Sequence, residues 1–354
     1  MSITQRLSAS VLVATVALGS VALRADELDR HSSKTPLRGT ITAETSREIT
    51  IKVTQAGKTE DVKVTMSDVA DVKYEGAAGL ALRTAFSMER AGQLEKAIEA
   101  YQKAAGTANG MGFVAQAIQF GQTRTLAKLA LQDSQRLDEA IKAVEDFRGR
   151  FADSRFHYPL HELLGQLQLM KGNDAAAGQA FRELATSPAN DFKLKSSIWD
   201  GRLLLKAGKF AEAEAKFDEV AAAKASTPAE KLQQQEAMLA KGDCLVKQKK
   251  LDEAAQMFRK VIEGAPPDEA ELQAATCNAL GDVLREAGKP KEALLAYLEV
   301  DLLYSTQKAA HAKAMYYTAL LWDQVGRADY ATESREKLKR LYPESSWVKQ
   351  PPKN

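Results

Sequence analysis

The sequence has few cysteines, few aromatic residues and no excess of one charge. Cys244 and Cys277 are its only cysteines among 354 residues, and aromatic side chains make up 6%. Two cysteines cannot build a disulfide framework. The 49 basic residues are nearly balanced by 47 acidic ones, whereas binding to nucleic acid needs clustered cations that displace counterions from phosphate. We therefore expect no nucleic-acid partner.

Motifs for catalysis are missing as well. The sequence has no glycine-rich phosphate loop, no paired Ser-Lys motif and no His-Glu zinc motif. His157 and His161 have the spacing of two metal ligands on one helix face. Pro159 lies between them, however, and favours a helix that begins near Tyr158 and leaves His157 at its edge. We expect no enzyme activity, no cofactor and no metal site.

A long apolar run occurs only at the N-terminus. Arg6 precedes an apolar stretch over residues 7–23, and small residues follow it. This arrangement resembles a secretory signal peptide of 25 residues, with cleavage after Ala22 or Ala25. The alternative is a retained membrane anchor, because the run approaches the ~20 residues that a span needs. We expect export to the periplasm or another extracytoplasmic compartment, with no membrane span after signal removal.

The segment over residues 37–75 has the period of β-strands. Apolar residues alternate with polar ones in two runs, at Ile49, Ile51, Val53, Val62, Val64 and Met66. Gln55 to Lys58, between the runs, is typical of a hairpin turn. We expect a small β-strand module here, with some similarity to Sm-like or SH3-like barrels, preceded by a linker at residues 26–36.

The rest of the chain repeats one pattern seven times. Each copy has a central alanine, and most copies have a glycine before it and a large apolar residue four positions after it. The central alanines are Ala97, Ala140, Ala177, Ala213, Ala254, Ala293 and Ala331. The intervals between them are 43, 37, 36, 41, 39 and 38 residues. Self-similarity at such a period indicates a solenoid of stacked helix pairs.

Each copy has the residues that a helix pair needs. Gly201 is on the first helix of one copy, and Ala213 and Phe217 lie four apart on the second, which places them on one face. Alanine allows a close crossing and the aromatic ring fills the space beside it. Glycines that tolerate positive φ are expected at the turns between paired helices: Gly92, Gly172, Gly208, Gly288 and Gly326.

These residues resemble the tetratricopeptide repeat family. Leu280-Gly281, Gly288, Ala293 and Tyr297 follow the family pattern well, and Leu341-Tyr342-Pro343 is similar to repeat ends in envelope-associated members. The resemblance covers residues 78–347 and implies a mainly α superhelix of about seven helical hairpins, with a disordered tail at 348–354. The intervals exceed the usual ~34 residues, so longer helices or loops are expected, for example at 149–155 and 265–269.

In this family, ligands usually lie against the first helices of the repeats. The resemblance therefore implies a binding groove whose candidate residues are Lys195, Ile198, Arg202, Leu239, Asp243, Asn278, Asp282, Arg285, Tyr316 and Leu320. Members that bind chaperone tails use a clamp of Lys and Asn residues over successive repeats. Asn278 has no such partners at matching positions, so a peptide with a terminal carboxylate is not specially favoured.

Two interpretations of function follow. The favoured one is an exported, non-enzymatic scaffold that holds an extended peptide or a partner protein in its groove. The alternative is an envelope- or polysaccharide-binding factor that uses the β module, with the repeats as a spacer. Cys244 and Cys277 lie on neighbouring first helices, so a disulfide is conceivable after export. Their different heights on those helices favour buried free thiols instead.

Overall fold

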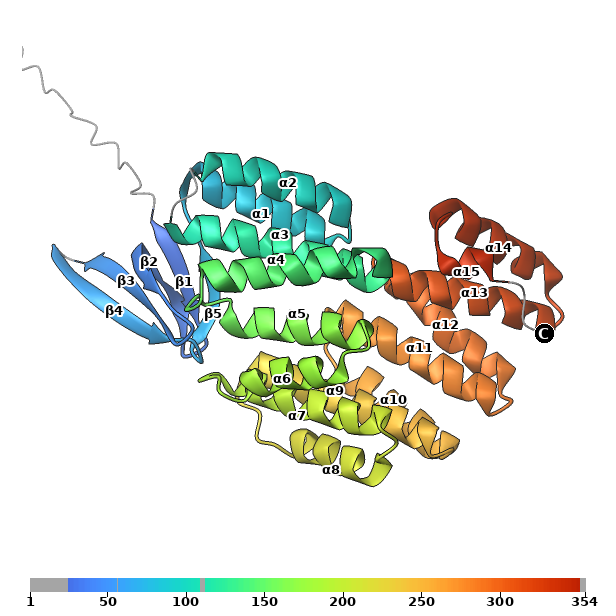
Figure 1. The fold of residues 1–354 in the computed structure, drawn as a ribbon. Coiled ribbons are helices and arrows are strands. Elements are labelled where there is room, and N and C mark those ends of the chain that lie inside the picture. Colours follow the sequence, from blue (N-terminus) through green and yellow to red (C-terminus); the bar gives the residue numbers. More distant parts are fainter. Residues whose placement is uncertain (1–24, 56, 109–111, 351–354) are drawn as a thin grey trace, which may run out of the picture.

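The structure is a computed structural model that describes residues 25–55, 57–108 and 112–350. A β-sheet at the N-terminal end is followed by a curved array of helices that continues to the C-terminus (Figure 1). Residues 1–24, where the signal peptide is expected, and residues 351–354 lie outside the described residues. Within the described residues, no helix combines the length and the apolar character that crossing a membrane requires.

The sheet contains five antiparallel strands in the order β4-β3-β2-β1-β5. Their bounds are β1 Asp26–Arg30, β2 Ser33–Glu44, β3 Glu48–Gln55, β4 Lys58–Thr65 and β5 Val69–Lys73. The pair Gln55 and Lys58 closes the hairpin between β3 and β4, as the sequence predicts. On one face, Ile49, Ile51 and Val64 are buried, because successive residues of a strand point to opposite sides.

The predicted linker at residues 26–36 is wrong. These residues form β1 and the start of β2, and β1 pairs with both β2 and β5. The strand is hard to recognise because four of its five residues are charged. Leu28, its one apolar residue, is fully buried, and Asp26 accepts hydrogen bonds from the backbone N–H groups of Ile41 and Glu75. Burial of Leu28 and these bonds fix the strand.

Fourteen helices of the described part form seven antiparallel hairpins, each consisting of an odd-numbered and the following even-numbered helix. This confirms the mainly α repeat array. The first helices are α1 Gly76–Arg90, α3 Gly112–Gln132, α5 His157–Met170, α7 Asn190–Lys206, α9 Pro228–Lys247, α11 Ala270–Glu286 and α13 Lys308–Gln324. The second helices are α2 Leu94–Thr107, α4 Leu137–Arg150, α6 Asp174–Leu184, α8 Phe210–Ala221, α10 Leu251–Gly264, α12 Pro290–Leu303 and α14 Ala328–Leu341. A short helix, α15 Ser346–Lys349, packs on α13 and includes the start of the predicted tail.

Most turns between paired helices contain a glycine with positive φ, as predicted, and two turns do not. The five predicted glycines all have positive φ. The second hairpin has no such glycine, and a 3-10 turn at Ser134–Arg136 with Asp133 as its N-cap connects α3 to α4. In the fifth hairpin, Lys249 takes the left-handed conformation with φ of 63°. A lysine in this region is strained, because its Cβ crowds the backbone.

Within four of the repeats, a glycine of the first helix lies directly against an aromatic ring of the second. A Cβ atom added at any of these glycines would overlap the ring of its partner; the pairs are Gly165 with Phe181, Gly201 with Phe217, Gly242 with Phe258 and Gly281 with Tyr297. All four rings are fully buried. The repeat pattern of a small residue and a large one is thus a packing requirement at the helix crossing.

The sheet and the repeats share one hydrophobic core. A single cluster of buried residues runs from Leu28 and Ile51 of the sheet to Phe120, Phe147 and Phe156 of the second and third hairpins. The lengthened loop predicted over 149–155 contacts the sheet at its end: the Asp153 carboxylate accepts hydrogen bonds from the backbone N–H and hydroxyl of Ser46. The β module is therefore built into the array.

The array curves until its beginning meets its later part. Gly92, at the first hairpin turn, lies so close to the loop between α12 and α13 that an added Cβ would be 3.3 Å from the carbonyl oxygen of Thr306. In Figure 1 the ends of α3 and α4 point toward the helices of the sixth repeat. The first helices consequently surround a hollow along the inside of the curve.

Candidate functional site

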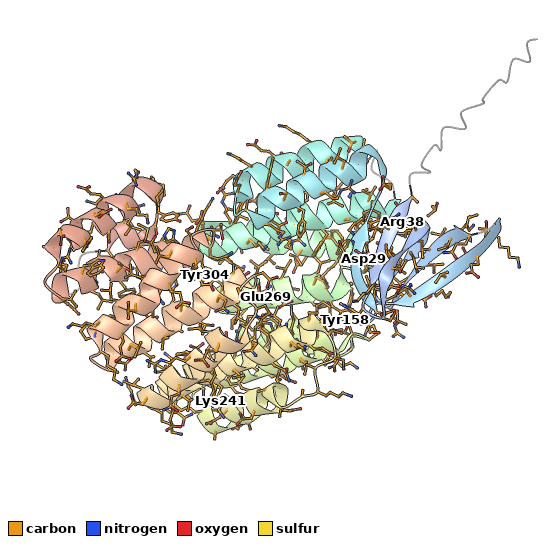
Figure 2. The ribbon with its side chains drawn as sticks, turned by 180° about the vertical axis from the view of Figure 1, so that it is seen from behind. Asp29, Arg38, Tyr158, Lys241, Glu269 and Tyr304 are labelled. Carbon is orange, nitrogen blue, oxygen red and sulfur yellow. The ribbon has the colours of Figure 1, made fainter. Side chains whose placement is uncertain are left out.

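The inner side of the curve is formed by first helices. Consecutive odd-numbered helices from α1 to α13 contact one another, and α5 and α7 do so through the Glu162–Lys195 ion pair. Five of them, α3, α5, α7, α9 and α11, enclose a groove of about 460 Å³. Figure 2 labels Glu269, at the start of α11, near the middle of the array. We call this space the central groove; its main lining residues are Phe120, Arg124, Lys128, Leu131, Glu162, Leu163, Lys195, Trp199, Arg202, Leu232, Glu236, Leu239, Glu269, Glu271, Leu272 and Ala275.

One side of the central groove is apolar. Trp199 of α7 stacks on Phe181 with ring centroids 4.3 Å apart, and the guanidinium of Arg202 lies 4.7 Å from the centroid of Trp199. These contacts hold the indole in one orientation. Leu232 and Leu239 of α9 continue the apolar lining. A fixed aromatic ring between aliphatic side chains suits apolar parts of a bound chain.

The two cations from α3 are held by a buried carboxylate. Glu89 of α1 is 3% exposed and accepts hydrogen bonds of 2.7 and 2.6 Å from Arg124. Lys128 lies 3.0 Å from the same carboxylate, and the Tyr101 hydroxyl donates to it at 2.8 Å. Burial disfavours the charged form, but these partners hold the pKa of Glu89 below its usual value. Arg124 and Lys128 are thus neutralised from within the protein.

A second ion pair links the third and fourth repeats. Lys195 of α7 donates a 2.7 Å hydrogen bond to Glu162 of α5. Burial opposes the charge on Lys195, but Glu162 raises the pKa of the lysine above its usual value. Glu236 of α9 faces the same region, and burial raises the pKa of its carboxyl although Lys195 and Arg202 favour the charged form.

The structure brings three of the predicted residues together in the central groove and buries two others. Lys195, Arg202 and Leu239 line the groove. Ile198 is 1% exposed and belongs to the core between α7, α8 and α9. Asn278 is 4% exposed, and its side-chain N–H donates to the carbonyl oxygen of Ala310. Ile198 and Asn278 therefore hold the repeats together and are not groove-surface residues.

Three more predicted residues lie on the inner side of the fifth and sixth repeats without lining the central groove. Asp282 accepts hydrogen bonds from the Tyr297 hydroxyl and from Lys313. The guanidinium of Arg285 lies 4.6 Å from the ring centroid of Tyr317. Asp243 is open to solvent, but the protein around it restricts hydration and raises the pKa of its carboxyl to about 6.

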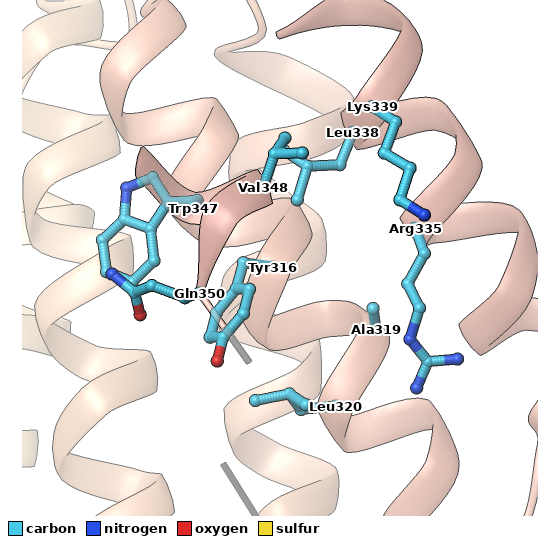
Figure 3. A pocket seen from close by; sticks show the side chains of 9 residues that line it. All are labelled: Tyr316, Ala319, Leu320, Arg335, Leu338, Lys339, Trp347, Val348 and Gln350. Carbon is cyan, nitrogen blue, oxygen red and sulfur yellow. The ribbon is translucent and has the colours of Figure 1, made fainter. Parts of the chain in front are cut away.

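The last two predicted residues line a different pocket. Tyr316 and Leu320 of α13 face a pocket of about 240 Å³ at the C-terminal end of the array (Figure 3). Trp347 and Val348 of α15 and Leu338 of α14 also line this pocket, and the ring centroids of Trp347 and Tyr316 are 5.3 Å apart. This pocket is separate from the central groove, because the two share no lining residue.

The cysteines are free and buried, as the sequence favours. Burial raises the pKa of the Cys277 thiol to about 12, so it stays protonated and unreactive. His157 begins α5, and its ring centroid is 4.6 Å from that of His161. His161 is buried with its Nδ1 atom lacking a hydrogen-bond partner. Burial, helped by Arg148 and His157, lowers the pKa of His161 to about 4.

Sequence reasoning missed the half of the central groove that comes from α3 and α5. Arg124, Lys128, Glu162 and Leu163 lie there. The second repeat has no glycine at its first turn, so its first helix could not be placed in register with the others. Trp199 was also missed, although an aromatic residue on the face of a first helix is a signal that could have identified it.

Comparisons with known proteins agree with the fold. Family models described as tetratricopeptide repeat match residues 80–106, 126–191 and 201–269. These segments are tetratricopeptide repeats, which confirms the resemblance, and a protein of this class is typically a scaffold for protein interactions. None of the curated proteins compared with the chain matches it.

Several solved structures are similar at low identity. PilW, a widely conserved type IV pilus biogenesis factor, is 16% identical with a TM-score of 0.42, over 64% of this chain and 96% of PilW. Pseudomonas aeruginosa PilF is 17% identical with a TM-score of 0.39, over 65% and 96%. A Rap protein complexed with competence and sporulation factor is 12% identical with a TM-score of 0.46, over 74% and 75%. Scores this low support no functional conclusion for this chain.

Proposed function

We propose that this chain is an exported, non-enzymatic scaffold of the cell envelope, and that it holds an extended segment of a partner protein in the central groove. The observation that carries the proposal is the groove itself, about 460 Å³ enclosed by five first helices. Its apolar side offers a fixed Trp199 ring, and its rim is charged. Such a surface binds through burial of apolar side chains, while rim charges set orientation.

Export is supported by the sequence of the first 25 residues, where a basic start, an apolar run and small residues follow one another. The interpretation of the β module as a separate binding factor has less support. The sheet shares its hydrophobic core with the second and third hairpins. The repeats therefore form part of the folded β module and are not only a spacer for it. Deleting residues 26–75 would expose that core and could not separate the two interpretations.

A substitution that fills the groove tests the proposal. Ala275 of α11 is exposed and lines the central groove, so Ala275→Trp adds bulk there without removing a core contact. Ala215→Trp on α8 is the matched control, because Ala215 is exposed and lies outside the groove. The measurement is crosslinking in the native envelope followed by purification and mass spectrometry.

We expect the unmodified protein and the Ala215→Trp variant to recover the same dominant protein partner, and the Ala275→Trp variant to recover at least about tenfold less of it, because a filled groove cannot seat the segment. Equal recovery by both variants would show that the partner binds elsewhere.

A further inference from the structure

Some charged side chains of the central groove have an ion-pair partner within the protein, and others do not. Three of its four cations have carboxylate partners inside the protein: Arg124 and Lys128 contact Glu89, and Lys195 contacts Glu162. Arg202 is the fourth, and it lies over the Trp199 ring. Three of the four cations are therefore engaged in ion pairs within the protein before any ligand arrives.

The acids that α9 and α11 contribute to the groove form no such ion pairs. Glu236 of α9, Glu269 at the N-cap of α11 and Glu271 in the first turn of α11 all line the groove. Within the described residues, none of these three carboxylates forms a side-chain hydrogen bond or an ion pair. Glu236 is only partly exposed, and burial raises the pKa of its carboxyl even though Lys195 and Arg202 favour the charged form. A cation from outside would restore the interactions that this carboxylate has lost with water.

Apolar side chains lie beside these acids. Leu232 and Leu239 are on the same helix as Glu236, and Leu272 and Ala275 are on the same helix as Glu271. Trp199 of α7 lines the same groove. The α9 and α11 side of the groove therefore combines apolar surface with three unpaired negative charges.

We propose that the central groove selects an extended peptide segment that carries a lysine or arginine next to apolar residues. The basic side chain lies against Glu236 and Glu271, and the apolar residues contact Trp199, Leu232 and Leu272. This inference rests on the proposed function, since it names the chemistry of the segment that the same groove holds.

The test is selection of phage-displayed random dodecapeptides on the purified protein. The double variant Glu236→Gln/Glu271→Gln removes two of the unpaired charges with almost no change of shape. Glu253→Gln/Glu333→Gln is the matched control, because both residues are exposed acids outside the groove and the net charge changes equally. Ala275→Trp identifies the peptides that bind in the groove.

We expect the unmodified protein and the control to enrich peptides with Lys or Arg beside apolar residues, and the Ala275→Trp variant to lose them. A synthetic peptide from this set, titrated by fluorescence anisotropy, should bind the Glu236→Gln/Glu271→Gln variant about tenfold more weakly. Its affinity for the unmodified protein should fall as salt is raised.

Two other outcomes would overturn the inference in different ways. The first is enrichment of acidic or uncharged peptides that the Ala275→Trp variant does not bind. This result would contradict the preference for a basic segment but would still support peptide binding in the groove. Selected peptides that bind the Ala275→Trp variant as well as the unmodified protein, or no enrichment at all, would reject both the basic segment and the peptide-binding groove.

Discussion

Glu44 of β2 and Arg155 of the loop before α5 form an ion pair, with Arg155 Nε 3.1 Å from Glu44 Oε2. The Glu44 side chain is 1% exposed, and the Tyr74 hydroxyl donates a 2.6 Å hydrogen bond to its other oxygen. Arg155 lies 4.2 Å from the ring centroid of Phe156. This pair joins the β module to the repeats at the edge of their shared core.

Replacing Arg155 by methionine should destabilise the protein, because it leaves the buried Glu44 carboxylate without its counter-charge. We expect a loss of about 3 kcal/mol in the free energy of unfolding at pH 8. Burial raises the pKa of Glu44, and loss of Arg155 raises it further. A group whose pKa is raised on folding contributes stability at low pH and loses it as pH rises, so the loss should be smaller at pH 5.

Urea unfolding of the single variant and of Glu44→Gln/Arg155→Met checks this prediction. The double variant should be more stable than Arg155→Met alone, because no uncompensated charge remains. Equal stability of the two variants at both pH values would contradict the account of this junction.

Adding one methyl group at a helix crossing should disrupt a repeat. In Gly201→Ala the new Cβ would lie 2.5 Å from the Phe217 ring, and overpacking of this kind costs about 2 kcal/mol. Gly106→Ala on α2 is the matched control, since no atom lies within 4 Å of its added Cβ. That control should stabilise by about 0.5 kcal/mol. The measurement is the thermal unfolding midpoint of each variant. A similar shift of the midpoint in both variants would contradict the packing argument.

Lys249 occupies a turn position where five of the other repeats have glycine, and its φ is 63°. Lys249→Gly should raise the free energy of unfolding by about 1 kcal/mol, because glycine adopts this conformation without the Cβ clash. The variant also loses an exposed ion pair with Glu286, which contributes little. Chemical denaturation measures the free energy of unfolding of both proteins. A less stable variant would show that the Lys249 side chain contributes more to stability than its backbone strain costs.

Stability should depend on pH through His161. Its pKa is lowered from 6.5 to about 4 by burial, with smaller contributions from Arg148 and His157. A histidine whose pKa is lowered on folding stabilises the protein above pH 6.5, and that contribution falls as pH decreases toward 4, by about 3 kcal/mol in total. His161→Leu should flatten the stability curve over this range. The same slope in the variant would assign the pH dependence to other groups.

The repeats could be predicted because their signals are local. In four repeats a glycine of the first helix contacts a ring sixteen residues later, as Gly201 contacts Phe217, so the same spacing recurs in the sequence. Strand β1 could not be predicted, because Leu28 is its one apolar residue and one of its two partner strands, β5, is distant in sequence. The sequence predicts the lengthened loop at 149–155 from the repeat interval, but it does not predict the ion pair between Arg155 of this loop and Glu44.

The groove was harder to predict because it depends on the rotation between repeats. Ile198 and Leu239 occupy matching positions relative to their central alanines, yet the first is buried in the core and the second lines the groove. Lengthened repeats change the rotation from one helix pair to the next, so matching positions need not face the same space.

The most direct test of the central claim places a photo-crosslinking amino acid, p-benzoylphenylalanine, at position 275 inside the groove and, in a second protein, at position 215 outside it. Illumination in the native envelope should yield one dominant crosslinked protein from position 275, attached through a short extended segment, and none from position 215. Crosslinks to the same protein from position 215 alone, or from neither position, would contradict the account.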